Sequence, residues 1–165
     1  MTGKTHAICG TTALVTYIAF NTSAVSIGLS TVNPAIGLVS VAMGSYAPDI
    51  DIPDSHLGRK FKIISKHLTH RGITHTLLVP FVLYCVINYL SISTIVASII
   101  FGFLFGYVMH LFADMFNKKG IPLLWPLMTK HFHIMTIKTR SATETMFMVI
   151  WVVVCVGAAF LGRVL

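Results

Sequence analysis

Residues 94–113 read TIVASIIFGFLFGYVMHLFA and are followed directly by Asp114. An α-helix needs roughly 20 apolar residues to cross the hydrocarbon core of a bilayer, and this stretch holds no charged side chain. The two polar groups at its end, His110 and Asp114, are four residues apart, so on a helix they lie on the same face. The stretch therefore predicts a transmembrane helix that carries an imidazole and a carboxylate at one end.

The composition of the whole chain agrees with a membrane protein. Hydrophobic residues make up 55% of the 165 residues, whereas Asp, Glu, Lys and Arg together make up only 10%. Soluble domains carry about 25% charged residues, so neither a soluble globular domain nor a disordered chain is the first interpretation. The length predicts a single membrane-embedded domain over residues 1–165.

Four further apolar stretches occur at residues 7–20, 34–47, 76–90 and 145–162. Together with residues 94–113 they predict an all-α fold, a polytopic membrane bundle of about five transmembrane helices. The first three stretches of the chain are shorter than a bilayer is thick, so we expect them to tilt or to thin the bilayer locally.

Residues 57–68 combine apolar and basic side chains at helical spacing. The apolar residues are Leu57, Phe61, Ile64 and Leu68, and the basic residues among them are Arg59, Lys60, Lys62 and Lys66. Such a pattern is typical of a short helix that lies in the plane of the lipid headgroups. We expect this interfacial helix to attract anionic lipid headgroups, by about 1 kcal/mol for each basic residue near the surface. A plain basic linker is the alternative.

The basic residues alternate between the two sides of the predicted bundle. Lys4 precedes the first stretch, five basic residues lie between the second and third, and five lie between the fourth and fifth. Residues 91–93, which join the third stretch to the fourth, carry no charge. By the positive-inside rule the N-terminus and both long loops are cytoplasmic, and the C-terminus is outside. This topology explains the net charge of +7, so nucleic acid is not an expected partner.

Seven titratable residues from four predicted helices gather on the cytoplasmic side of this topology. They are His6, Asp49, Asp51, His70, His75, His110 and Asp114. Groups of this kind are costly near hydrocarbon unless they pair with one another or bind an ion. Their convergence predicts a metal centre at the level of the cytoplasmic headgroups.

The residue types indicate which ions such a centre holds. Imidazole and carboxylate ligands suit Zn²⁺, Mn²⁺ or Fe²⁺, with zinc expected first, whereas Ca²⁺ and Mg²⁺ prefer oxygen ligands alone. Seven candidates exceed the ligands of one zinc ion, so either two or more ions bind or some of the residues orient the ligands. A cluster of divalent ions indicates hydrolysis, because such ions lower the pKa of a water molecule and stabilise a leaving oxygen.

Some of these residues also have ordinary structural explanations. His6 taken alone is typical of a polar group at a helix end, and His110 is compatible with a hydrogen bond inside the bundle. The other four histidines are expected to be polar groups at headgroup level: His56, His67, His131 and His133.

Two further pairs of residues fit structural roles. Ser141 and Glu144 have the spacing of a capping box at the start of the last predicted helix. Gly102 and Gly106 form a Gly-xxx-Gly pair, which predicts close helix packing either inside the bundle or in a homodimer.

Arg71 lies between His70 and His75 in the run HRGITH. An arginine beside a metal centre is well suited to hold phosphate oxygens in a forked, charge-assisted contact. Anchoring of the topology by its positive charge is the alternative role.

These motifs resemble the YdjM-like family of bacterial inner-membrane proteins, described as metal-dependent hydrolases associated with the LexA regulon and its SOS response. The matching stretches are residues 48–51 (PDID), 57–66 (LGRKFKIISK), 70–75 (HRGITH), 106–114 (GYVMHLFAD) and 120–126 (GIPLLWP). The resemblance implies location in the inner membrane. It also implies a remote kinship to zinc-dependent phospholipase C and the S1/P1-type nucleases, which use a His-xxx-Asp pair like His110 and Asp114. Ile52 departs from the family pattern, which usually has a histidine there.

The function expected from the residues and the resemblance is metal-dependent hydrolysis of a phosphoester, such as a phospholipid or another lipid-linked phosphate. Asp51 or Asp54 would carry the proton, and Arg71 would hold the phosphoryl oxygens. Two alternatives stay open: a non-catalytic membrane protein with a structural metal, and a metal-ion transporter. Transport needs polar groups at the membrane midplane, and no charged residue lies deep inside the predicted helices.

Overall fold

The computed structural model describes residues 1–21, 25–27, 30–69, 71–90 and 92–164. Within these ranges the α-helices are α1 (Gly3–Phe20), α2 (Pro34–Tyr46), α3 (Lys62–His67), α4 (Leu78–Tyr89), α5 (Thr94–Asp114) and α6 (Ala142–Val164). Two 3-10 turns, η1 (Pro48–Asp51) and η2 (Ile73–His75), precede α3 and α4. Strands β1 (Val25–Ile27) and β2 (Ser30–Val32) form a short antiparallel pair between α1 and α2. Each of the five predicted apolar stretches is a helix.

The prediction of about five transmembrane helices is wrong by the criteria of length and composition. Among the described helices, two are long and apolar enough to cross a membrane, α5 and the part of α6 from Ala142 to Gly162. Helices α2 and α4 have 13 and 12 residues, too few for a bilayer of ordinary thickness. Helix α1 has 18 residues, but Lys4, His6 and several threonines lower its hydropathy.

The helices begin where short polar side chains cap them. The side chain of Thr2 accepts a hydrogen bond from the backbone of Thr5 at the start of α1. Asn33 caps α2 in the same way, directly before Pro34, and Ser93 caps α5. Such residues satisfy backbone N–H groups that have no partner inside the helix. The caps therefore set the N-terminal ends of three of the helices that build the bundle.

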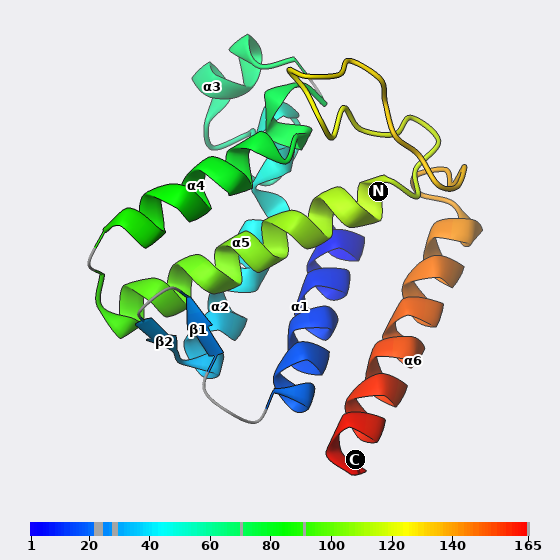
Figure 1. Ribbon diagram of the computed structural model, residues 1–165. Coiled ribbons are helices and arrows are strands. Elements are labelled where there is room, and N and C mark those ends of the chain that lie inside the picture. The colour runs from blue at the N-terminus through cyan, green and yellow to red at the C-terminus, as the bar shows by residue number, and fades with distance from the viewer. Residues whose placement is uncertain (22–24, 28–29, 70, 91, 165) are drawn as a thin grey trace.

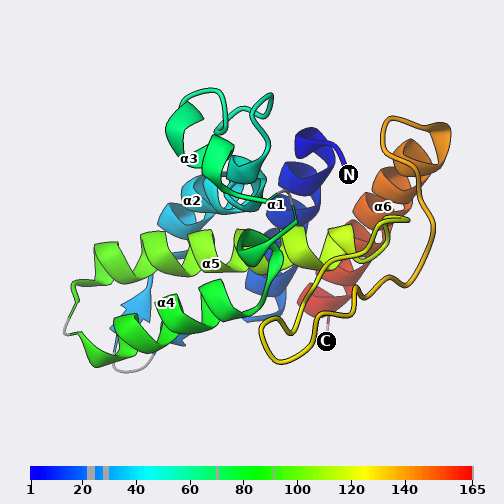
Figure 2. The same cartoon turned by 90° about the horizontal axis from the view of Figure 1, so that it is seen from above.

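Helix α5 crosses the molecule, and the other helices are arranged around it (Figure 1). The most extensive packing joins α2 to α5, and α1 packs against α2, α5 and α6. Seen from above, α4 runs along the N-terminal part of α5, and α6 lies near the opposite end of α5 (Figure 2). The N-terminus, α3, and the connection from α5 to α6 all lie at one end of the molecule (Figure 1). The predicted multi-pass topology and the cytoplasmic side of the N-terminus stay predictions.

The crossing of α2 and α5 is close because glycines face the opposing backbone. A Cβ atom added to Gly102 would collide with the carbonyl oxygen of Gly37, and one added to Gly106 would collide with that of Val41. Small residues at such positions allow two helix backbones to approach one another. The structure thus places the predicted Gly-xxx-Gly pair in packing inside the bundle. The predicted homodimer stays a prediction.

Helix α6 is fastened to α1 by its first turn. The buried carboxylate of Glu144 accepts hydrogen bonds from the hydroxyl of Thr5 at 2.8 Å, from the backbone of Thr2, and from the backbone of Arg140 at 2.6 Å. Ser141 accepts from the backbone of Glu144 at 3.4 Å, as the predicted capping box requires. The Ser141 half of the predicted capping box is thus present, whereas the Glu144 carboxylate bonds the backbone of Arg140, one residue before the cap, and also holds the start of α1.

The predicted interfacial helix is shorter than expected. Residues 53–61 form turns, and the helix covers Lys62–His67 alone. Its apolar side chains are nevertheless exposed, since Ile63 is 79% and Ile64 is 47% accessible. Exposed apolar residues beside basic ones remain compatible with contact to a lipid surface.

We predict that Gly106→Val lowers the free energy of unfolding by about 3 kcal/mol, because a branched side chain cannot fit against the α2 backbone. Denaturant unfolding in detergent micelles measures the change. The matched control is Gly157→Ala on α6, where nothing lies within 4 Å of the added Cβ. Alanine there should keep or slightly raise the stability, since it favours helix. Equal stability of the two variants would contradict the close crossing.

Candidate metal centre

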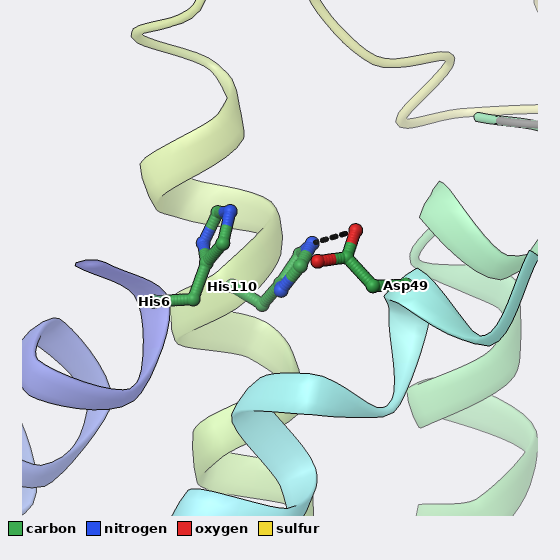
Figure 3. Close-up of side chains that lie close together, drawn as sticks. All are labelled: His6, Asp49 and His110. Atoms are coloured by element: carbon green, nitrogen blue, oxygen red, sulfur yellow. Dashed lines mark ion pairs between the residues drawn. The ribbon is translucent and has the colours of Figure 1, made fainter. Parts of the chain in front are cut away.

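Four segments bring their imidazole and carboxylate groups into one buried place. His6 comes from α1, Asp49 and Asp51 from η1, His75 from η2, and His110 and Asp114 from α5. All six side chains are buried, and the three imidazoles are completely inaccessible. Figure 3 shows His6, His110 and Asp49 pointing toward one another from their three elements. His70, the seventh predicted ligand, lies outside the described residues.

Three overlapping sets of these residues have the spacing that a metal ion needs. The sets are His6, Asp49 and His110; His75, His110 and Asp114; and Asp49, Asp51 and His75. In each set one ligand atom per residue lies within 4.8 Å of the others. Because the sets share members, the structure groups the six described candidates into one centre.

The imidazoles of His6 and His110 are stacked, with ring centroids 3.6 Å apart. Nδ1 of His110 donates a hydrogen bond to the carbonyl oxygen of Ser45 at 2.7 Å. Its proton is therefore on Nδ1, and the lone pair of Nε2 is directed to Asp49 Oδ1, 3.7 Å away. Among the described residues, Nε2 of His110 and both ring nitrogens of His6 have no hydrogen-bond partner.

His75 is oriented by its neighbours in a similar way. Its Nδ1 lies 3.2 Å from Oδ2 of Asp51 and 3.1 Å from the hydroxyl of Thr74. Asp51 Oδ2 also accepts hydrogen bonds from the Thr74 hydroxyl at 2.9 Å and from the backbone of Arg71 at 2.8 Å. Nε2 of His75 lies 3.9 Å from Asp49 Oδ1. A carboxylate behind a histidine is the arrangement that commonly orients metal ligands.

Asp114 is contacted by two cationic groups and by one imidazole. Arg71 Nη2 lies 3.0 Å from Asp114 Oδ2, and the α-amino group of Met1 donates to Oδ1 at 2.6 Å. His6 Nε2 lies 3.3 Å from the same Oδ1. Asp114 is thus held by ion pairs on both oxygens.

Arg71 is buried and has a φ of 60°, in the left-handed region that is costly for a residue with a side chain. Its guanidinium also donates to the carbonyl oxygen of Gly120. Both terminal nitrogens of Arg71 therefore contact the protein, and its predicted contact with phosphate stays a prediction.

Asp49 lies between the stacked pair of His6 and His110 on one side and His75 on the other. Burial raises the pKa of its carboxyl, and the neighbouring His6 acts in the opposite direction. An ionised carboxylate in such a place is unfavourable unless a positive charge compensates it. A divalent cation among Asp49, His6 and His110 would supply that charge.

The donor set fits a transition-metal ion of the zinc type. Buried imidazole nitrogens without partners are unfavourable when no ion is present, because a buried polar atom loses its hydrogen bonds to water. Neutral imidazoles together with carboxylates are the ligands that Zn²⁺, Mn²⁺ and Fe²⁺ accept. The residues of this centre could therefore hold such an ion.

The remaining candidates lie apart from the centre. His56, His67, His131 and His133 are exposed. Asp54, one of the two predicted proton carriers, is also exposed, and it lines a cavity next to Asp49.

Sequence reasoning missed three groups that position the centre: the carbonyl of Ser45, the hydroxyl of Thr74 and the carbonyl of Gly120. Two of them are backbone atoms, which any residue supplies, so no residue type signals them. Thr74 was within reach of prediction, because it directly precedes His75 and its hydroxyl can join a histidine to a carboxylate.

Comparison with known proteins places the chain among bacterial membrane proteins. It matches the family model described as YdjM inner membrane protein over residues 1–164. The inner membrane protein YdjM of Escherichia coli (strain K12) is 44% identical over 94 residues, or 53% of this chain and 47% of that protein. The protein of the same name from Shigella flexneri matches equally well, so the chain spans about half the length of these two curated relatives.

A further relative is similar over more of its length. The uncharacterized protein YvsG of Bacillus subtilis (strain 168) is 32% identical over 152 residues, which are 87% of this chain and 85% of that protein. No solved structure matches the chain, so the predicted kinship to phospholipase C and the S1/P1 nucleases stays a prediction. The match to the family model covers nearly the whole chain, and the chain therefore belongs to the YdjM family of inner membrane proteins.

Proposed function

We propose that the protein is a metal-dependent hydrolase of the inner membrane that cleaves a phosphoester at the cytoplasmic membrane face. One observation carries this proposal. The buried Nε2 of His110 and Nδ1 of His6 lack hydrogen-bond partners among the described residues, and carboxylates lie close to both imidazoles. Such a set is expected where an ion completes the structure.

The ion would be held by His6, His110 and Asp49, with His75 and Asp114 beside them. Zinc is the first choice, and Mn²⁺ or Fe²⁺ would accept the same ligands. A bound divalent ion would supply Lewis acidity, which activates water and stabilises a leaving oxygen. Overlap of the three residue sets suits either one ion or a pair.

The protein's own groups orient the ligands. The Ser45 carbonyl contacts Nδ1 of His110 and directs its Nε2 toward Asp49. Asp51 contacts Nδ1 of His75 and in the same way leaves Nε2 of His75 facing Asp49. We therefore assign Asp51 to positioning His75, and Arg71 to holding Asp114 through their 3.0 Å ion pair. The role of proton carrier, predicted for Asp51 or Asp54, would then belong to the exposed Asp54.

A substrate can approach the centre from the side of Asp49. The imidazoles of His6, His75 and His110 are inaccessible, whereas the Asp49 side chain is 12% exposed. Asp49 also forms part of the wall of a cavity of about 770 Å³. A phosphoester is the favoured substrate because basic side chains line that cavity, as described below.

A second function, a non-catalytic protein with a structural metal, is favoured by one observation. The donors come from α1, η1, η2 and α5, so an ion among them would join four segments of the fold. A structural ion adds its binding free energy to folding. Both hypotheses predict bound metal, but only the hydrolase predicts turnover of a phosphoester. Metal content and turnover must therefore both be measured.

We expect the purified protein in detergent to contain zinc, and His6→Gln and His110→Gln to lose most of it. Elemental analysis measures the metal, and circular dichroism verifies that the variants remain folded. His133→Gln is the matched control, because His133 is exposed and outside the centre. Free zinc at about 100 times its Kd should stabilise the wild type by about 3 kcal/mol, read from thermal unfolding with and without a chelator. Unchanged zinc content in both variants would remove these histidines from the centre.

We expect the zinc-loaded wild type to hydrolyse bis(p-nitrophenyl) phosphate or phosphatidylglycerol. Asp51→Asn should lower the turnover by about 10- to 100-fold, because the orientation of His75 is weakened. His133→Gln should retain wild-type turnover. If zinc is bound and the chelator unfolds the protein, but no phosphoester is cleaved, the metal is structural and the hydrolase is contradicted.

A further inference from the structure

Besides Tyr46 and Asp49, three segments of the chain line the cavity. They are residues 1–4 at the start of α1, residues 52–59 after η1, and residues 139–140 before α6. These segments meet at the end of the molecule where the N-terminus lies (Figure 1). Because Asp49 belongs both to the wall of this cavity and to the metal centre, the cavity reaches the centre.

Each of the three segments contributes one basic side chain to this cavity: Lys4, Arg59 and Arg140. All three are exposed, and none of them forms an ion pair within the described ranges. Asp54 and His56 line the cavity as well, so its exposed charges are three cations and one carboxylate. The cavity is therefore positively charged next to the one partly accessible carboxylate at the edge of the centre.

The backbone of Arg59 belongs to a turn that is held against Asp49. The hydroxyl of Ser55 donates to the backbone carbonyl of Asp49 at 2.6 Å and accepts from the backbone of Gly58 at 2.8 Å. A Cβ atom on Gly58 would collide with the carbonyl oxygen of Ile52, so the turn that precedes Arg59 is tight. Arg59 is thereby connected to the centre through a single side chain.

The other two cations are joined by Glu144. Its carboxylate accepts from the backbone of Arg140, from the backbone of Thr2, which caps α1, and from the hydroxyl of Thr5, which directly follows Lys4. Arg140 has a φ of 61°, and the hydrogen bond from its backbone to Glu144 helps to hold this unfavourable conformation. The contacts of Ser55 and of Glu144 thus hold the backbone segments that carry the three cations around one cavity.

We propose that this cavity binds the phosphate group of the substrate, with Lys4, Arg59 and Arg140 as its binding residues. The inference rests on the proposed function and specifies where the substrate lies in it. Three cations at the rim and an ion behind Asp49 suit the non-bridging oxygens of a phosphate group, which carry its negative charge. A lipid headgroup and a free phosphoester share this chemistry.

The test uses the zinc-loaded full chain in detergent micelles and the double variant Arg59→Gln, Arg140→Gln. Calorimetry measures the binding of inorganic phosphate, which requires no turnover. We expect the double variant to bind phosphate at least about tenfold more weakly than the wild type. For bis(p-nitrophenyl) phosphate its KM should rise by a similar factor while kcat stays within about twofold. Lys138→Gln, an exposed basic residue outside the cavity, is the matched control and should behave as the wild type.

Vesicles distinguish the two sources of the phosphate. Loss of binding to phosphatidylglycerol vesicles in the double variant supports a lipid headgroup as the source. Vesicle binding that equals the wild type, while phosphate binding is lost, supports a free phosphoester. Phosphate affinity and KM that equal the wild-type values would overturn the inference and leave the hydrolase standing. A wild type without zinc or turnover, whose phosphate binding still depends on both arginines, would overturn the hydrolase and leave the anion site.

Discussion

The close approach of α2 and α5 is the constraint on which the metal centre depends. Only because the glycines of the crossing have no side chain can the carbonyl of Ser45 reach Nδ1 of His110 at 2.7 Å. Asp49 follows directly after α2, so the same crossing brings its carboxylate within 3.7 Å of Nε2 of His110. A helix pair with larger residues at the crossing would separate both partners from His110, and the centre would lose its middle ligand.

The position of α1 depends on polar contacts as well as on apolar ones. His6 stacks on His110, and the first turn of α1 is held by Glu144 at the start of α6. Further along, the indole of Trp151 donates to the carbonyl of Cys9 at 3.2 Å. Helix α6 otherwise buries little of itself, since 6% of its most apolar part is covered inside the protein. Its outer face is therefore free to meet lipid while its inner edge holds α1 and with it His6.

Much of the fold follows from the amino-acid sequence, because charge and apolar runs alternate clearly along it. The five apolar stretches are helices, and six of the seven proposed ligands lie together, with His70 outside the described residues. The number of membrane-spanning helices could not be predicted from apolar runs, since burial against α5 gives α2 an apolar sequence just as lipid would. Arg71 was equally ambiguous: its ion pair with Asp114 joins residues 43 positions apart, and sequence spacing cannot reveal it.

The hydrogen bond from His110 to Ser45 ends on a backbone carbonyl, and this affects which substitutions position 45 can accept during evolution. Every amino acid at position 45 supplies that carbonyl oxygen, so a point mutation there does not remove the acceptor that orients the imidazole of His110. The Ser45 side chain is restricted for a different reason, since a Cβ added to Gly10 would collide with its hydroxyl and one added to Gly106 would crowd it. The volume of the side chain at position 45, and not its polarity, therefore limits which residues can replace Ser45, so small residues of any polarity should be tolerated there.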